Sequence, residues 1–165
     1  MRISAASLAG GEISYNKPLG LRYNRSESAL FEILEHTADI GLRARGKTKA
    51  ELFANAALAL ESIAVDLEPV RPESAYPIAA TGEDDQALLV NWLSEVLYYL
   101  DGGRIVMCRF QVDELERGSV RGRGWGEPWD NTRHRAKVVV KGVTYHQLKL
   151  TKDSQGWCAE VFLDI

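Results

Sequence analysis

Residues 84–112 decide the fold class, because the stretch DDQALLVNWLSEVLYYLDGGRIVMCRFQV joins a complete helix to the start of a strand. Asp84 and Asp85 are typical of a helix start, where a carboxylate accepts hydrogen bonds from the free amides of the first turn. A broad apolar stripe follows at helical spacing, and Gly102-Gly103 ends the helix. From Arg104 onward, every periodic segment is typical of a strand.

A second helix is predicted upstream of this stretch, from about Lys49 to Asp66. Thr48 and Glu51 have the spacing of a capping box, in which each side chain satisfies a free backbone amide of the first turn. Pro69 lies just beyond the predicted end of the helix. The predicted buried face consists of Leu52, Phe53, Ala56, Leu60 and Ile63.

Strands are predicted on both sides of the helices. Turn-forming residues at 152–156 predict that the last two strands form a hairpin. Two helices with several hairpin-like strands indicate an α+β domain with a largely antiparallel sheet. Residues 1–29 have neither helical nor strand periodicity, which predicts a loosely ordered N-terminal extension before a domain of residues 30–165. The predicted strands are residues 31–35, 40–45, 74–80, 105–112, 119–124, 143–150 and 157–163.

Length and composition indicate one compact cytoplasmic domain. The chain has 165 residues, of which 45% are apolar and 26% charged. No apolar run approaches the roughly 20 residues that cross a bilayer, and the first residues build no signal-peptide core. Cys108 and Cys158 belong to no Cys-x-x-Cys motif, so we expect free thiols in a reducing compartment.

The basic residues are concentrated in one part of the chain. The net charge is −3, but residues 117–141 hold seven basic and two acidic residues, a local charge of +5. With Trp125 and Trp129, this segment fits either a stacking platform for single-stranded nucleic acid or a solvated hairpin with aromatic anchors. The acidic total argues against a protein that binds RNA over its whole surface.

Two acidic segments are candidates for a cation site. The turn His36-Thr37-Ala38-Asp39 places an imidazole and a carboxylate between two strands, although Asp39 is equally suited to hold turn amides. At the other end, Val161 to Ile165 is an apolar strand that closes on Asp164 and the terminal carboxylate. Carboxylate and carbonyl oxygens suit a hard cation, whereas the alternative for the second segment is a docked terminus.

Two further motifs are less specific. Lys141-Gly142-Val143-Thr144-Tyr145-His146 combines a lysine suited to a phosphate or carboxylate with an imidazole, but it fits no common triad or phosphate loop. Gly122-Arg123-Gly124-Trp125-Gly126 has the glycine content of a nucleotide loop without the strand-to-helix context that aims amides at a phosphate.

Taken in order, four segments resemble the archease family. They are residues 35–41 (EHTADIG), residues 126–130 (GEPWD) with His134, residues 141–146 (KGVTYH) and the final Asp164-Ile165. The resemblance covers about residues 31–165. The chain departs from it at Gly142, where family members often have alanine, and in the more basic Arg133-His134-Arg135.

The resemblance implies a β/α/β sandwich that activates an RtcB-type RNA ligase in tRNA splicing and RNA repair. It implies that the protein promotes guanylylation and multiple turnover of the ligase and does not join RNA itself. The ligase, not this protein, would then bind RNA and GTP. It also implies a divalent cation on Asp39, Asp164 and Ile165, with calcium as the first candidate and magnesium or manganese as alternatives. Lys141 is a further functional position, and His36 and His146 lie in matching motifs without an assigned ligand role.

Two other functions stay open from the residues alone. A metal-dependent phosphoesterase would use Asp39 and Asp164 to position a cation that activates water, although no general base is evident. An RNA-binding module would use the basic residues of 117–141, and its affinity would fall steeply with salt.

Overall fold

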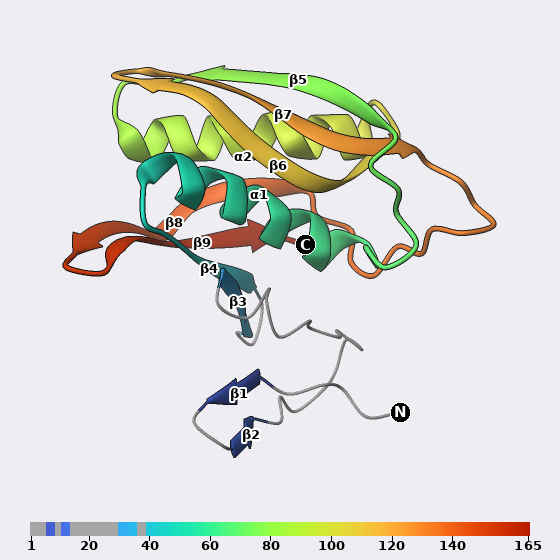
Figure 1. Ribbon diagram of the computed structural model, residues 1–165, viewed down its shortest axis with the longest axis horizontal. Helices are drawn as coiled ribbons and strands as arrows, with labels where there is room; N and C mark the ends of the chain where they lie inside the picture. Colours follow the sequence, from blue (N-terminus) through green and yellow to red (C-terminus); the bar gives the residue numbers. More distant parts are fainter. Residues whose placement is uncertain (1–5, 9–10, 14–29, 36–38) are drawn as a thin grey trace.

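A computed structural model describes residues 6–8, 11–13, 30–35 and 39–165 of the chain. In these ranges, two helices lie between two antiparallel sheets, which confirms the α+β class and the β/α/β sandwich (Figure 1). One sheet has the order β3-β4-β9-β8, with β3 Phe31–Glu35, β4 Ile40–Gly46, β8 Gly142–Asp153 and β9 Gly156–Asp164. The other has the order β5-β7-β6, with β5 Ser74–Thr81, β6 Ile105–Glu116 and β7 Ser119–Pro128. The helices are α1 Lys49–Ala64 and α2 Asp85–Asp101.

The predicted N-terminal extension is described only in part. Two short strands, β1 Ala6–Leu8 and β2 Gly11–Ile13, pair with each other antiparallel. The rest of residues 1–29 lies outside the described ranges, so the predicted loose order of this segment stays a prediction.

Both helices begin at the predicted caps. The Thr48 hydroxyl accepts a hydrogen bond from the Glu51 amide at 3.1 Å, and the Glu51 carboxylate accepts one from the Lys47 amide at 2.7 Å. The Asp84 carboxylate accepts one from the Ala87 amide at 2.8 Å. Helix α1 ends at Ala64 rather than Asp66, because Val65 turns into an extended conformation and forms a β-bridge to the loop between β7 and β8.

The glycines of β7 allow the sheet to approach the helix layer. A Cβ atom on Gly124 would overlap the Met107 sulfur, and one on Gly122 would contact the Trp92 ring of α2 too closely. The Gly122–Gly126 segment is therefore a packed strand rather than a phosphate loop, as its context predicted.

Both cysteines are free thiols and half-buried, as expected from the sequence. Burial raises the pKa of the Cys108 thiol, and Cys108 lies where the β6–β7 register shifts. Neither described helix is long and apolar enough to cross a membrane.

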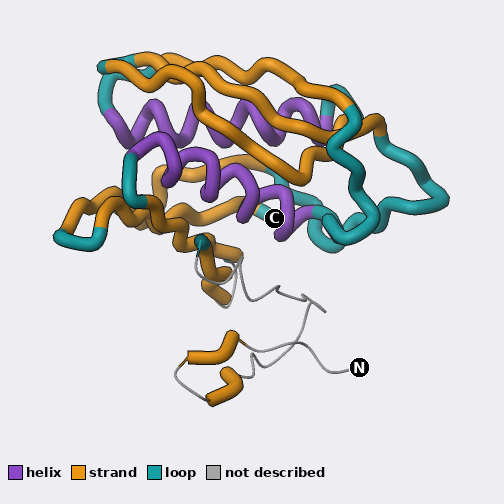
Figure 2. The backbone as a smooth tube through the Cα atoms, viewed as in Figure 1, coloured by secondary structure: helices purple, strands orange, loops and turns teal. Residues whose placement is uncertain are grey.

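Two long loops meet at one end of the sandwich. Figure 2 shows the connections from α1 to β5 and from β7 to β8 in teal at the same end of the molecule. The Val65–Ala136 bridge joins these loops, and the Lys137 amide donates to the Ala64 carbonyl at 2.8 Å. The second loop leads directly to Lys141 and the first residue of β8, so this junction fixes the approach to that strand.

Helix α1 buries a carboxyl group that the helical pattern would place outside the core. Glu61 is fully buried, and neither of its carboxyl oxygens has a hydrogen-bond partner within the described residues. Burial raises the pKa of Glu61 well above its ordinary value of 4.5, with the nearby Met107 backbone acting to a smaller extent in the opposite direction. Burial therefore favours the neutral form of the Glu61 carboxyl in the folded protein.

We expect Glu61 to make the protein less stable as pH rises. Below about pH 4.5 the carboxyl is protonated in both states; above it the unfolded chain loses the proton and the folded chain keeps it. Folding stability should then fall by up to about 1.4 kcal/mol per pH unit until the folded pKa is reached. Urea unfolding of wild type and Glu61→Gln between pH 5 and 8 tests this. Parallel pH profiles would contradict it, and Glu61→Leu should be the more stable protein at pH 8.

Candidate functional site

The ends of β4 and β9 bring Asp39 and Asp164 together. Ile40 pairs with Leu163, and the same antiparallel register, continued by one residue, sets Asp39 opposite Asp164. Ile40 and Leu163 are buried beneath the helices, and side chains alternate along a strand. If the register and the alternation continue by one residue, the two carboxylates lie on the outer face of the sheet at the paired ends of β4 and β9.

Lys141 completes the strand end from the other side of β9. Its backbone amide donates to the Asp164 carbonyl at 2.7 Å, and its ammonium donates to the Ile165 carbonyl at 3.1 Å. Gly142, the next residue, pairs with Asp164, and a Cβ atom added to it would meet nothing within 4 Å. The replacement of alanine by glycine at this position thus leaves the packing around the site unchanged.

Charges elsewhere on this outer face are neutralised in pairs. The Arg43 guanidinium contacts Glu32 at 2.6 Å and Glu160 at 2.7 Å, and Lys149 contacts Glu160 at 3.2 Å. Arg43 holds the pKa of the Glu160 carboxyl below its ordinary value. Among the described residues, Asp39 and Asp164 have no comparable partner for their side chains, so the strand end is the acidic part of this face.

The donor atoms at the strand end suit a hard cation. Two carboxylates and the Ile165 carbonyl are oxygen ligands of the kind that calcium, magnesium and manganese take. The described ranges contain no group of three or more His, Cys, Asp or Glu residues placed to hold a metal ion. A cation here would therefore need carbonyl oxygens and water besides Asp39 and Asp164.

The two histidines of the sequence motifs are not both placed at this site. His36 lies outside the described residues. His146 is exposed on β8, four residues beyond Gly142, in the segment where the pairing with β9 shifts. Its Nε2 lies 3.2 Å from the Gln147 side-chain nitrogen, and the structure does not bring it to the two carboxylates.

A buried cluster of charged and polar side chains anchors the loop that leads to Lys141. Glu127, near the end of β7, is 2% exposed, and Arg133 binds its two carboxylate oxygens at 2.9 and 2.7 Å. The Arg71 amide and the His134 imidazole approach the same carboxylate at 2.9 and 3.0 Å. Because these contacts join both long loops, the GEPWD motif and His134 have a structural role in placing the site.

The cluster also determines the charge states of its members. Arg133, with smaller contributions from the Arg71 amide and His134, holds the pKa of Glu127 at about 2, although burial acts in the opposite direction. The His134 Nδ1 atom accepts from the Asp130 amide at 3.0 Å, so its Nε2 is the atom that donates to Glu127. The cluster is thus an ionised carboxylate surrounded by four donors.

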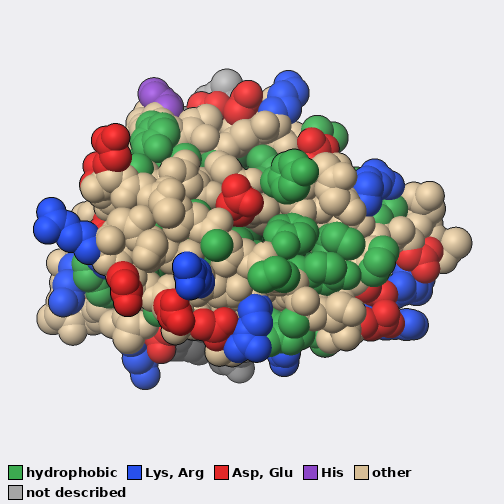
Figure 3. Space-filling model, turned by 90° about the horizontal axis from the view of Figure 1, so that it is seen from above, with side chains coloured by type: hydrophobic (Ala, Val, Ile, Leu, Met, Phe, Trp, Pro, Cys, Tyr) green, Lys and Arg blue, Asp and Glu red, His purple; other side chains and the backbone are tan. Residues whose placement is uncertain are grey.

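The basic segment does not form one continuous basic surface. On the outer face of β7, the Trp125 ring has the Arg109 guanidinium 4.0 Å and the Arg123 guanidinium 5.1 Å from its centre. Asp113 pairs with Arg123 at 2.9 Å. Figure 3, which looks onto the molecule from above the β5-β7-β6 sheet, shows basic, acidic and apolar side chains interspersed. The two arginines compete with any base for the ring of Trp125.

Sequence patterns did not predict the exposure of three apolar side chains next to Lys141. Val139, Tyr145 and Ile165 are 72%, 58% and 38% exposed. Of the run Val138-Val139-Val140, only Val140 belongs to the buried core, and Val138 packs against it partly buried. The sequence offered one signal for this exposure. Lys141 is exposed and follows the buried Val140, so an alternating pattern would also expose Val139.

Comparisons with known proteins agree with this geometry. The sequence profile of the Archease protein family matches residues 31–165. A protein archease from Methanosarcina mazei is 41% identical over 144 residues, which cover 85% of this chain and 99% of the relative. A protein archease from Sulfurisphaera tokodaii is 35% identical over 136 residues, covering 82% and 98%.

A solved structure supports the same assignment. The solution structure of Methanobacterium thermoautotrophicum protein 1598 superposes with a TM-score of 0.69 at 31% identity, and it covers 82% of this chain and 98% of that one. The two helices, the two antiparallel sheets and the matched region of residues 31–165 all agree with one family. The chain belongs to the archease family.

Proposed function

We propose that this archease activates an RtcB-type RNA ligase by promoting its guanylylation and multiple turnover in tRNA splicing and RNA repair. Family membership implies the ligase as partner. The observation that carries the proposal is the strand end where Asp39 and Asp164 face each other beside the contact of Lys141 with Ile165. This strand end is an acidic tip, rich in oxygen ligands. A divalent cation bound there would lie between the tip and the phosphate groups in the active site of a partner.

The proposed cation is divalent, with calcium first and magnesium or manganese as alternatives. Asp39, Asp164 and the Ile165 carbonyl would hold it, and the bound ion would supply positive charge next to phosphate oxygens. The chain itself would contribute two carboxylates at the paired ends of β4 and β9 and, through Lys141, a second positive group beside them. Preorganised charge of this kind stabilises the transfer of a nucleotide phosphate.

The two alternative functions have less support. A stand-alone phosphoesterase needs a general base near its cation, and no described His, Cys, Asp or Glu joins the two aspartates in a metal-binding group. An RNA-binding module needs unpaired basic side chains, whereas Arg133 is engaged with Glu127 and Asp130, and Arg123 with Asp113. The activator role therefore accounts best for the acidic tip.

We expect catalytic amounts of the purified protein to raise both the guanylylation rate and the turnover number of the cognate ligase. The measurement is incorporation of labelled GMP and joining of RNA ends, with and without the archease. The protein alone should join no RNA. Ligation by the isolated chain, or an unchanged ligase in both assays, would disprove the proposed function.

A further inference from the structure

Exposed apolar side chains are grouped beside the proposed site. Of the large apolar residues in the described part of the chain, Tyr98, Val139, Tyr145 and Ile165 are exposed. The last three lie within four residues of Lys141 or in hydrogen-bond contact with it. An exposed apolar group of this kind, around a polar centre, marks an interaction surface more often than scattered single residues do.

Tyr145 is displayed by an irregular segment of β8. Pairing with β9 shifts between Thr144 and Lys149, so residues 145–148 lie opposite the single residue Val161. Gln147 has a φ of 54°, a left-handed conformation that is unfavourable for a residue with a side chain. Such bulges re-aim side chains next to functional sites. The strand ladder resumes on both sides, so the exposed segment is held rather than loose.

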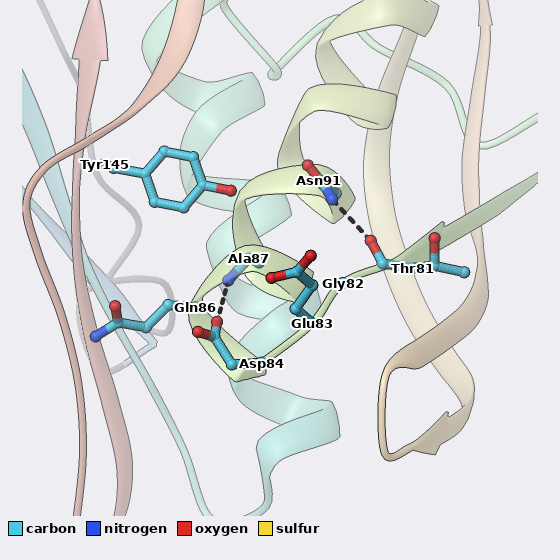
Figure 4. Close-up of a pocket in the computed structure, with 8 residues that line it drawn as sticks. All are labelled: Thr81, Gly82, Glu83, Asp84, Gln86, Ala87, Asn91 and Tyr145. Carbon is cyan, nitrogen blue, oxygen red and sulfur yellow. Dashed lines mark hydrogen bonds between the residues drawn. The ribbon is translucent and has the colours of Figure 1, made fainter.

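The Tyr145 ring forms one wall of an open cleft of about 720 Å³ between β8 and the start of α2. Figure 4 shows the ring directed toward the first turns of α2. The opposite wall includes Glu83, Asp84, Gln86 and Asn91, of which Asp84 caps the helix and Asn91 donates to a backbone carbonyl. Glu83 is exposed, and its carboxylate shares the cleft with the aromatic face.

We propose that this cleft receives an arginine or lysine side chain of the partner ligase, with Tyr145 as the anchor. An aromatic face attracts a cationic head group, and a carboxylate beside it adds charge complementarity. Tyr145 lies four residues from Lys141, about 13 Å of extended chain, and β8 is the edge strand of its sheet, so a partner that wraps around this edge would contact both the cleft and the acidic tip. The inference rests on the proposed ligase partnership, to which it adds a docking contact separate from the cation site.

The test compares two exposed tyrosines. The affinity of full-length Tyr145→Ala for the ligase, measured by biolayer interferometry, should fall at least tenfold. Tyr98→Ala removes a tyrosine of similar exposure from α2 and should bind like wild type. Tyr145→Phe should retain most of the affinity, since the ring is kept. At saturating protein, Tyr145→Ala should still stimulate guanylylation fully, because the aspartates are intact.

Each failure has a separate meaning. Equal affinity of Tyr145→Ala and Tyr98→Ala overturns the docking inference while stimulation by wild type upholds the ligase partnership. A wild-type chain that does not stimulate the ligase overturns the proposed function, and one that does not bind the ligase overturns both proposals.

Glu83→Gln should weaken binding of the ligase several-fold and reduce the salt dependence of that binding. No change in either would overturn the assignment of a basic occupant. Wild-type binding to single-stranded RNA that Tyr145→Ala loses, with ligase affinity unchanged, would overturn the inference in favour of RNA.

Discussion

Asp39→Ala and Asp164→Ala are each expected to reduce ligase stimulation to the level of the ligase alone. Either change removes one charge and one oxygen ligand from the proposed site, whose acidic side chains are the two aspartates. Neither side chain takes part in the core, so unfolding free energies should stay within about 0.5 kcal/mol of wild type. The measurements are GMP incorporation into the ligase, cation binding by calorimetry, and urea unfolding of each variant.

Matched variants separate charge from shape. Asp164→Asn retains the size of the side chain and should fail like Asp164→Ala if the negative charge is what holds the cation. Gly142→Ala lies beside Asp164 in the ladder, points its methyl group into open space and should stimulate like wild type. Lys141→Ala should impair stimulation less than loss of an aspartate, because the Ile165 carbonyl remains. Full stimulation by folded Asp39→Ala and Asp164→Ala would show that the strand end is not the working site.

Local patterns predicted the helices well because caps and stripes are local features. Thr48, Glu51 and Asp84 make the contacts that their spacing indicated.

The ends of the strands were harder to predict than those of the helices. β6 continues to Glu116 instead of ending near residue 112, since register shifts within the strand interrupt the alternation on which the prediction relied. β7 continues to Pro128, beyond the predicted end at residue 124. The alternation was hard to follow there because the glycines of β7 have no side chain that could indicate a buried face.

The candidate site depended on information that local patterns do not contain. Asp39 and Asp164 are far apart in the sequence, and their juxtaposition arises from the register of β4 with β9. Only the resemblance to archeases connected them beforehand. The β8 irregularity that exposes Tyr145 was also hidden, because residues 143–150 alternate well enough to suggest an unbroken strand.

Burial of acidic side chains was the least predictable feature. Glu61 lies on the side of α1 that a two-layer protein would leave to solvent, but here sheets cover the helix on both sides (Figure 1). Glu127 is buried because four donors from two loops converge on it. The pKa values of the two carboxyls shift in opposite directions, since burial dominates at Glu61 and the contact with Arg133 dominates at Glu127.

Glu127→Ala is expected to destabilise the fold by about 2–4 kcal/mol, well beyond the small effect of either aspartate substitution at the strand end. The change leaves the Arg133 guanidinium without its main partner and the buried His134 without an acceptor. The expected loss is below the upper limit for fully buried pairs because the Arg133 side chain keeps 27% exposure. Asp113→Ala breaks an ion pair of similar geometry on the surface and should change stability little. Equal unfolding free energies for these two variants would contradict the structural role of the cluster.

Acid unfolding supplies a second measurement of the same cluster. The pKa of Glu127 is about 2 in the folded protein and near 4.5 when unfolded, so its contribution is complete above about pH 5 and is lost as pH falls toward 2. Asp130, whose pKa is also about 2, contributes to the same loss through its contacts with Thr132 and Arg133. Glu127→Gln removes one of these two groups, so its stability should fall less steeply than that of wild type between pH 5 and 2. Because the site residue Lys141 follows this loop, Glu127→Gln should also weaken ligase stimulation at pH 7, whereas Asp113→Ala should not. A Glu127→Gln protein with the wild-type acid profile and full stimulation would mean that the buried carboxylate neither stabilises the loop nor positions the strand end.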